Sequence, residues 1–212
     1  MYYNWEKNIN TEELKNVANL IKNGEIVVFP TETVYGIGAN ALNPEAVFKI
    51  FDAKERPSDN PLIVHIANKE DIYKVAETPN KIEQKLIDVF MPGPITIILK
   101  KKSIIPDIVS AGLDTVGIRM PSNKIAHKII KKAGVPIAAP SANISGRPSG
   151  TRIQDIREEL EKKVSVIIDG GISEYGLEST VVKVENEIPI ILRPRKNNTR
   201  TNWKIVRKGE CK

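Results

Sequence analysis

The chain contains 212 residues, of which 41% are hydrophobic and 27% are charged, and its formal net charge is +6. Such a chain can bury an ordinary apolar core in one large or two small domains, and its charge suits an anionic ligand. No apolar run approaches the roughly 20 residues that a membrane-spanning helix needs. The single cysteine, Cys211, excludes an intrachain disulfide and suits a reducing cytoplasm.

Short apolar runs rich in β-branched residues alternate with segments of helical periodicity. The runs predict buried strands, because bulky side chains fit a sheet that is covered on both faces. These strands are expected over residues 26–29, 62–66, 95–99, 116–120, 135–139, 164–168, 181–184 and 188–192. Helices are expected after the caps Asn10, Asn43, Asn68 and Asn80, after Ser122, and over residues 153–163. Asn10 and Asn80 are followed three residues later by Glu13 and Glu83, as in a capping box.

The alternation of strands and helices continues without a linker, a repeat or a low-complexity break. It predicts one α/β domain with a mixed sheet over residues 1–194. Residues 103–114 are expected to form a loop. The segment 195–212 carries seven basic residues and one acid, and we expect a peripheral, solvated tail with an edge strand around 203–206 rather than an RNA-binding element.

The loop from Lys54 to Pro61 crowds two cations, Lys54 and Arg56, beside the polar side chains of Ser58 and Asn60. Like charges repel, so a loop of this kind is typical of anion binding, although a solvated polar loop has the same composition. Arginine offers a planar fork to phosphate oxygens and lysine a compact charge. The loop therefore predicts a phosphate contact.

Three further polar loops lie at the ends of expected strands and carry Thr31 and Thr33, Ser141 and Asn143, and Ser179, which opens the strand over 181–184. Arg119 and Arg193 also end apolar runs. In open α/β sheets ligands bind at such strand ends, so these residues predict one basic cavity for a polyphosphate and a small zwitterion or carboxylate. His65 by itself is interpreted as a core residue. With two histidines and no carboxylate cluster, we expect no protein-held metal, and magnesium would be carried by substrate phosphates.

The glycines Gly36 and Gly38 precede Ala41 in the pattern G-x-G-x-x-A, which occurs in dinucleotide-binding sites. Six residues separate the expected strand from Gly36, so this pattern lies too far from the strand for that role. We expect these glycines to let the backbone approach a ligand or another strand. The chain also lacks a Walker A sequence, a G-x-S-x-G elbow and a Cys/His pair.

The ordered motifs over residues 12–194 resemble the YrdC/TsaC family. They are Pro-Thr-Glu-Thr-x-Tyr-Gly-x-Gly, Lys-x-Arg-Pro-x-x-x-Pro-Leu, Pro-Gly-Pro-x-Thr, Val-Gly-x-Arg-x-Pro, Pro-Ser-Ala-Asn-x-Ser-Gly and Glu-Ser-Thr-Val. The resemblance implies a twisted mixed sheet, flanked by helices, around a positively charged concave pocket. It implies a nucleotidyltransferase that makes threonylcarbamoyl-AMP and pyrophosphate from L-threonine, bicarbonate and ATP. A downstream transferase would use the product for threonylcarbamoyladenosine in tRNA, and the chain resembles the short single-domain form.

The resemblance also implies roles for individual residues. Lys54 and Arg56 would be the catalytic cations. The threonine site would contain Thr33, His65, Arg119, Ser141 and Ser179. The ATP site would contain Lys54, Arg56, Asn60, Thr115, Asn143, Thr151 and Arg193. One departure is Arg195, which follows Pro194 where the family usually has glycine and leaves the path of the tail open.

Three other functions are compatible with parts of the sequence. A non-catalytic RNA-binding module would suit the basic charge, but aromatic residues make up 5% of the chain and none alternates with basic residues. A carbamoyl-phosphate-using enzyme of the hydrogenase-maturation type would be larger and carry zinc-finger cysteines. A regulatory nucleotide binder would bind ATP without splitting it.

Overall fold

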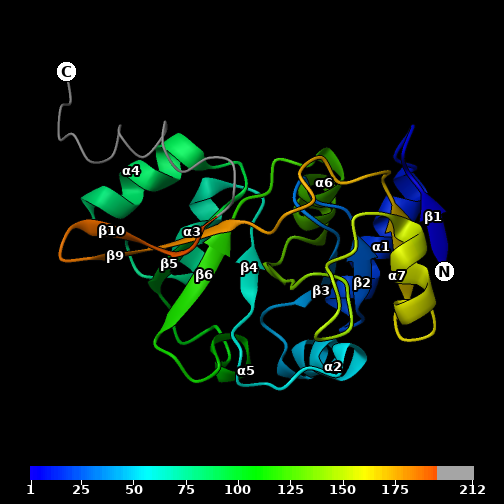
Figure 1. The fold of residues 1–212 in the computed structure, drawn as a ribbon, viewed down its shortest axis with the longest axis horizontal. Helices are drawn as coiled ribbons and strands as arrows, with labels where there is room; N and C mark the ends of the chain where they lie inside the picture. Colours follow the sequence, from blue (N-terminus) through cyan, green and yellow to red (C-terminus); the bar gives the residue numbers. More distant parts are fainter. Residues whose placement is uncertain (195–212) are drawn as a thin grey trace.

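A mixed sheet of ten strands runs through the computed structural model, which describes residues 1–194 (Figure 1). Its spatial order is β1-β8-β2-β3-β7-β4-β6-β5-β9-β10. The strands are β1 (Tyr2–Asn4), β2 (Val27–Phe29), β3 (Gly36–Asn40), β4 (Ile63–His65), β5 (Ile95–Lys100), β6 (Thr115–Arg119), β7 (Ile137–Ala138), β8 (Val166–Asp169), β9 (Thr180–Glu185) and β10 (Ile188–Arg193). The helices are α1 (Thr11–Lys22), α2 (Pro44–Lys54), η1 (Lys69–Asp71), α3 (Ile72–Val75), α4 (Lys81–Phe90), α5 (Asp107–Ser110), α6 (Lys124–Ala133) and α7 (Ile153–Leu160).

Strand β3 joins the two halves of the sheet. Its first residues, Gly36 to Gly38, pair antiparallel with β2, and its last two, Ala39 and Asn40, pair antiparallel with β7. On the β2 side, β8 lies between β1 and β2 and is parallel to both. On the β7 side, β4 and β6 are parallel neighbours, as are β5 and β9. The mixed sheet expected from the sequence is confirmed.

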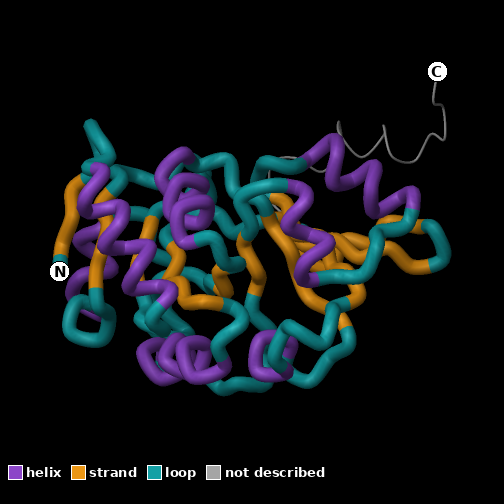
Figure 2. The backbone as a smooth tube through the Cα atoms, turned by 180° about the vertical axis from the view of Figure 1, so that it is seen from behind, coloured by secondary structure: helices purple, strands orange, loops and turns teal. Residues whose placement is uncertain are grey.

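Helices pack on both sides of the sheet, as Figure 2 shows from behind. The alternation of side chains in β2 sends Val27 and Phe29 toward α1 and α6, and Val28 toward the larger core that includes α2. On that second side, Leu86 of α4 is fully buried in the same core as Ile97 of β5. Strands of this kind are buried on both faces, which explains why their sequences are almost entirely apolar.

The cover formed by α1 and α6 reaches as far as β7, where Ile137 still belongs to their core. Beyond it, the strand register places Ile63, Gly117 and Ile98 side by side on the same face of β4, β6 and β5. Ile63 and Ile98 are partly exposed there, in the described part of the chain. A Cβ on Gly117 would lie 3.0 Å from Cγ2 of Thr96, so glycine keeps this face shallow. The helical cover therefore ends beside the carboxyl ends of β4 and β6.

The glycines Gly36 and Gly38 were predicted to let the backbone approach either a ligand or another strand, and the approach to another strand is confirmed at Gly38. A Cβ on Gly38 would lie 2.5 Å from Cε1 of Phe29 and 2.7 Å from Cγ2 of Ile137, so glycine permits close packing of the neighbouring strands. The segment was nevertheless expected as a loop, and it forms strand β3. Two short elements, β1 and α5, were also not predicted, and α5 lies within the expected loop 103–114.

The helix caps follow the sequence with one correction. Asn80 and Glu83 form the predicted capping box at α4. Asn10 caps α1, but the carboxylate of Glu13 accepts a hydrogen bond from Nε1 of Trp5 at 2.5 Å instead of completing a box. Within the described residues, no helix combines the length and apolar character required to cross a bilayer. The predicted edge strand around 203–206 lies outside the described residues.

Candidate active site

A cavity of about 240 Å³ opens where the helical cover of the sheet ends. Its walls come from the loop after β2, the loop between α2 and β4, the ends of β4 and β6, the loop after β7, and the segment from Glu178 to the end of β10. The lining residues are Thr31, Thr33, Val34, Tyr35, Gly36, Arg56, Asn60, Pro61, Leu62, Ile63, His65, Arg119, Ala139, Pro140, Ser141, Glu178, Ser179 and Arg193. The predicted convergence of polar strand ends on one cavity is therefore confirmed.

Arg119 and His65 form the deep end of this cavity. They are register partners at the ends of β6 and β4, and both are nearly fully buried. Nη2 of Arg119 pairs at 2.7 Å with the buried carboxylate of Glu32, which lies behind it in the loop after β2. Burial, followed by the charge of Arg119, lowers the pKa of His65 to about 3. This end thus contains a balanced ion pair and a neutral imidazole, which suits a zwitterion.

Short hydroxyl side chains surround the deep end. The hydroxyls of Thr31 and Thr33 lie 2.8 Å apart, and Thr31 donates to the carbonyl of Val34 at 2.6 Å, which fixes the turn after β2. Across the cavity, the hydroxyls of Ser179 and Thr96 lie 2.8 Å apart. These buried hydroxyls hold one another in place and can position a small polar ligand.

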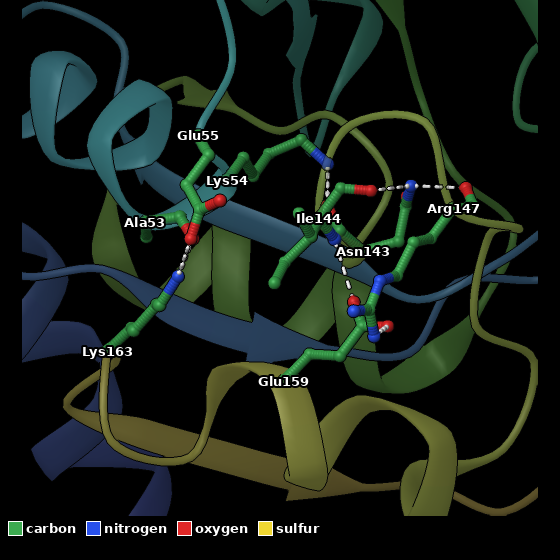
Figure 3. Close-up of polar contacts among 8 residues, drawn as sticks. All are labelled: Ala53, Lys54, Glu55, Asn143, Ile144, Arg147, Glu159 and Lys163. Carbon is green, nitrogen blue, oxygen red and sulfur yellow. Dashed lines mark hydrogen bonds and ion pairs between the residues drawn. The ribbon is translucent and has the colours of Figure 1, made fainter.

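Lys54, the last residue of α2, does not line the cavity, and its side chain points toward Asn143 of the loop after β7 (Figure 3). Its side chain is 1% exposed, and its Nζ donates to the backbone carbonyls of Ser141 and Asn143, both at 2.5 Å. Burial, followed by the charge of Arg56, lowers the pKa of Lys54 to about 8. Lys54 therefore ties the loop after β7 to α2 and supplies positive charge beside the cavity.

Arg56 follows in the next turn and lines the cavity directly. Glu55 adopts a left-handed conformation with φ of 52°, which ends α2 and turns the chain toward the cavity. Nη2 of Arg56 donates to the carbonyl of Asn60 at 3.2 Å. A backbone carbonyl holds the guanidinium without cancelling its charge, so Arg56 is well placed to receive an anion.

Arg193 reaches the opposite wall from the end of β10. Its Nε donates to the carbonyl of Ser179 at 3.0 Å and its Nη2 to the hydroxyl of Ser179 at 3.2 Å, while Nη1 pairs with the carboxylate of Glu178. The other carboxylate oxygen of Glu178 accepts a hydrogen bond from Ser149 at 3.4 Å. A carboxylate thus shares this shallower end of the cavity with Arg56 and Arg193.

Eight of the twelve residues predicted for the site line the cavity, and four do not. The eight are Thr33, Arg56, Asn60, His65, Arg119, Ser141, Ser179 and Arg193. Lys54 is buried beside it, as described. Thr115 shares the sheet face of Arg119 but lies at the other end of β6, opposite Lys100. Asn143 and Thr151 lie further along the loop after β7, in residues 142–152, which do not line the cavity and form the loop behind the wall.

The loop behind the wall is built around Asn143, whose side-chain nitrogen donates to the carbonyls of Ile144 at 2.9 Å and Arg147 at 2.8 Å. Glu159 of α7 clamps the same loop, accepting from the backbone nitrogen of Ile144 at 2.8 Å and from Arg147 at 2.9 Å (Figure 3). The carbonyl of Thr151 accepts from the backbone nitrogen of Ser173 at 3.2 Å. In this structure these two predicted ATP ligands stabilise the loop.

Sequence reasoning missed two carboxylates, Glu32 and Glu178. Each lies inside a motif that was recognised for its hydroxyls, Pro-Thr-Glu-Thr and Glu-Ser-Thr. An acid beside two hydroxyls usually predicts a cap or a turn, and only the fold shows that each faces an arginine of the cavity. Those ion pairs divide the cavity into a neutral deep end and a shallow end with excess positive charge from Lys54 and Arg56.

Comparisons with known proteins agree with this geometry. Residues 19–194 match the family model Sua5_yciO_yrdC, described as Telomere recombination. The chain is 46% identical over 191 residues to the threonylcarbamoyl-AMP synthase of Pyrococcus abyssi, covering 90% of this chain and 56% of that protein. It is 43% identical over 189 residues to the putative threonylcarbamoyl-AMP synthase of Methanocaldococcus jannaschii, covering 87% and 88%. The crystal structure of P. abyssi Sua5 complexed with L-threonine matches with a TM-score of 0.89 and 45% identity over 92% of this chain and 57% of that chain.

The chain spans about half the length of the P. abyssi protein and most of the length of the M. jannaschii protein. The family model extends over every segment that lines the cavity. The fold, with its helix-flanked mixed sheet, also agrees with the solved structure. The chain therefore belongs to the Sua5/YciO/YrdC family.

Proposed function

We propose that this chain is a threonylcarbamoyl-AMP synthase, which condenses L-threonine, bicarbonate or carbon dioxide, and ATP, and releases pyrophosphate. The observation that carries the proposal is the single cavity that joins a neutral, hydroxyl-rich end at Arg119 to a cationic end at Arg56 and Arg193. A zwitterionic amino acid suits the first end and a polyphosphate suits the second. The names of the relatives and the L-threonine complex of P. abyssi Sua5 support the proposed activity.

In this mechanism the amine of threonine adds carbon dioxide and loses a proton, which gives a carbamate. A carbamate oxygen then attacks the α-phosphorus of ATP, and the bond from that phosphorus to the departing pyrophosphate breaks. Arg119 would pair with the threonine carboxylate, while Thr33, Ser141 and Ser179 would position the polar atoms. Placement and charge stabilisation supply the catalysis, so a protein base is not required.

Negative charge accumulates on the phosphates as pyrophosphate leaves. Arg56 and Arg193 line the cavity, and the buried Lys54 contacts Ser141 of its wall, so all three would stabilise that charge. Removing one such group typically costs on the order of 100-fold in rate. Asn60 would shape the nucleotide end directly, and Asn143 and Thr151 would do so through the loop behind the wall, whereas Thr115 lies at the other end of β6.

Magnesium would enter with ATP and neutralise part of the phosphate charge. Within the described residues, no three His, Cys, Asp or Glu side chains gather as a metal site, and the carboxylate that lines the cavity is Glu178. This donor set fits an ion held mainly by phosphate oxygens and water. The product would pass to a threonylcarbamoyl transferase that acts on tRNA. A contact between this chain and that tRNA is part of the same proposal.

The test is incubation of the chain with ATP, magnesium, labelled bicarbonate and each amino acid in turn. We expect a labelled adenylate and pyrophosphate with L-threonine, and formation of both slowed on the order of 100-fold or more in Arg56→Ala. A matched reaction with Glu185→Gln, at the far end of β9, controls for substitution outside the cavity. Binding of ATP without splitting would contradict the proposal, as would a salt-sensitive RNA complex in a chain that forms no adenylate.

A further inference from the structure

Glu178 is the carboxylate on the wall of the cationic end, and the proposed mechanism gives it no role. It lines the cavity, and its side chain is 37% exposed. One carboxylate oxygen pairs with Nη1 of Arg193 and the other accepts a hydrogen bond from Ser149. It therefore bridges the end of β10 to the loop behind the wall.

Two more cations lie within electrostatic range of this carboxylate. Burial lowers the pKa of both Lys54 and Arg56, and the negative charge of Glu178 opposes that shift in both residues. One cation, Arg193, pairs with the carboxylate directly, and two more, Lys54 and Arg56, act on it through their charge alone. A carboxylate paired with an arginine carries the same sign of charge as a phosphate and likewise offers acceptor oxygens.

We propose that Glu178 is an internal counter-ion of the phosphate end, whose carboxylate pairs with Arg193 and competes with incoming polyphosphate for that guanidinium. This inference rests on the proposed function. The carboxylate of Glu178 accepts from Nη1 of Arg193, while the carbonyl and the hydroxyl of Ser179 accept from its Nε and Nη2. A phosphate that pairs with Nη1 of Arg193 displaces the carboxylate, which returns as pyrophosphate departs. Glu178 thereby weakens the binding of both ATP and pyrophosphate and favours release of the product.

The size of the effect follows from exposure. The side chains of Arg193 and Glu178 are 39% and 37% exposed, so their ion pair is worth no more than an ordinary surface pair. Replacing the carboxylate with an amide also removes repulsion between Glu178 and the entering phosphates. Together these terms predict that Glu178→Gln binds pyrophosphate roughly threefold to tenfold more tightly than wild type.

The experiment is calorimetric titration of the whole chain with inorganic pyrophosphate, with Mg-ATP and with L-threonine. We expect Glu178→Gln to bind pyrophosphate and Mg-ATP more tightly than wild type and to bind L-threonine with unchanged affinity. The L-threonine measurement separates a change at the phosphate end from a general loosening of the fold. In steady-state assays, the same variant should show a lower inhibition constant for pyrophosphate.

Glu185→Gln is the matched control, because it removes the same charge from the other end of β9, where Glu185 pairs with Lys183. If Glu185→Gln binds pyrophosphate as tightly as Glu178→Gln does, the change in net charge alone explains the effect and the inference is overturned. Unchanged or weaker pyrophosphate binding in Glu178→Gln would overturn it too, and a raised magnesium requirement would show that Glu178 is a metal ligand instead. Failure of wild type to bind pyrophosphate or ATP would refute the proposed function itself.

Discussion

Lys54 provides the most direct test of how a buried ammonium beside the cavity affects both stability and rate. The substitution Lys54→Met keeps the length of the side chain but removes both donors to the carbonyls of Ser141 and Asn143. Two hydrogen bonds from a charged donor contribute about 3–6 kcal/mol together. Keeping the ammonium out of water has the opposite effect, because the fall of its pKa from 10.5 to about 8 corresponds to about 3 kcal/mol.

The two terms largely offset each other, so Lys54→Met is expected to lose only about 0–3 kcal/mol of unfolding free energy at pH 7. Its rate of threonine-dependent pyrophosphate release should still fall on the order of 100-fold, because the charge beside the phosphates is gone. Lys49→Met, an exposed position on the same helix, is the control and should keep the wild-type rate.

The pH dependence of stability isolates Lys54. Above pH 8 the folded side chain loses its proton, while the unfolded chain keeps it up to pH 10.5. The unfolded state binds more protons in this window, so unfolding becomes less favourable as the pH rises. Because methionine does not titrate, wild type should gain about 3 kcal/mol relative to Lys54→Met between pH 8 and 10.5. Urea unfolding of both chains measures this gap, and a gap that stays constant with pH would refute the reasoning.

Three further substitutions probe other parts of the site and its support. Arg56→Ala should reduce pyrophosphate release on the order of 100-fold or more in a chain that remains folded, and a wild-type rate would show that Arg56 does not contact the phosphates. Ser141→Ala should raise the KM for L-threonine more than the KM for ATP, and the reverse result would show that the two substrates bind at the opposite ends from those assigned. Gly38→Ala should lower the unfolding free energy by about 1–3 kcal/mol in urea titrations, since its methyl group would meet Phe29 and Ile137; unchanged stability would contradict that packing.

The part of the site that the sequence predicted depends on one regularity, the polar residues that follow apolar strands. His65 and Arg119 end parallel neighbours, so their side chains meet without any long-range information beyond the strand order. The same reasoning placed Ser141 and Arg193 at the cavity, and the crowding of cations after Lys54 indicated Arg56. The interpretation of His65 as a core residue is confirmed by its burial, and it lines the cavity as well.

The part that the sequence did not predict depends on tertiary contacts of residues with ordinary local patterns. β1 has a polar sequence and exists because β8 pairs with it more than 160 residues later. β3 is rich in glycine, a poor strand former, but glycine is what allows Phe29 to pack against it. Lys54 looks like an exposed cation, and only the loop after β7 provides the carbonyls that make its burial tolerable.

The position of β8 between β1 and β2 also bears on synthesis of the protein. A nascent chain emerges from the ribosome in sequence order, yet β2 lacks its parallel neighbour until Val166–Asp169 has been translated. Arg193, at the end of β10, completes the cavity later still. Helices made early, such as α1, therefore pack against an incomplete sheet until β8 has been synthesised. A polypeptide terminated before β10 would lack Arg193 and with it one wall of the cavity.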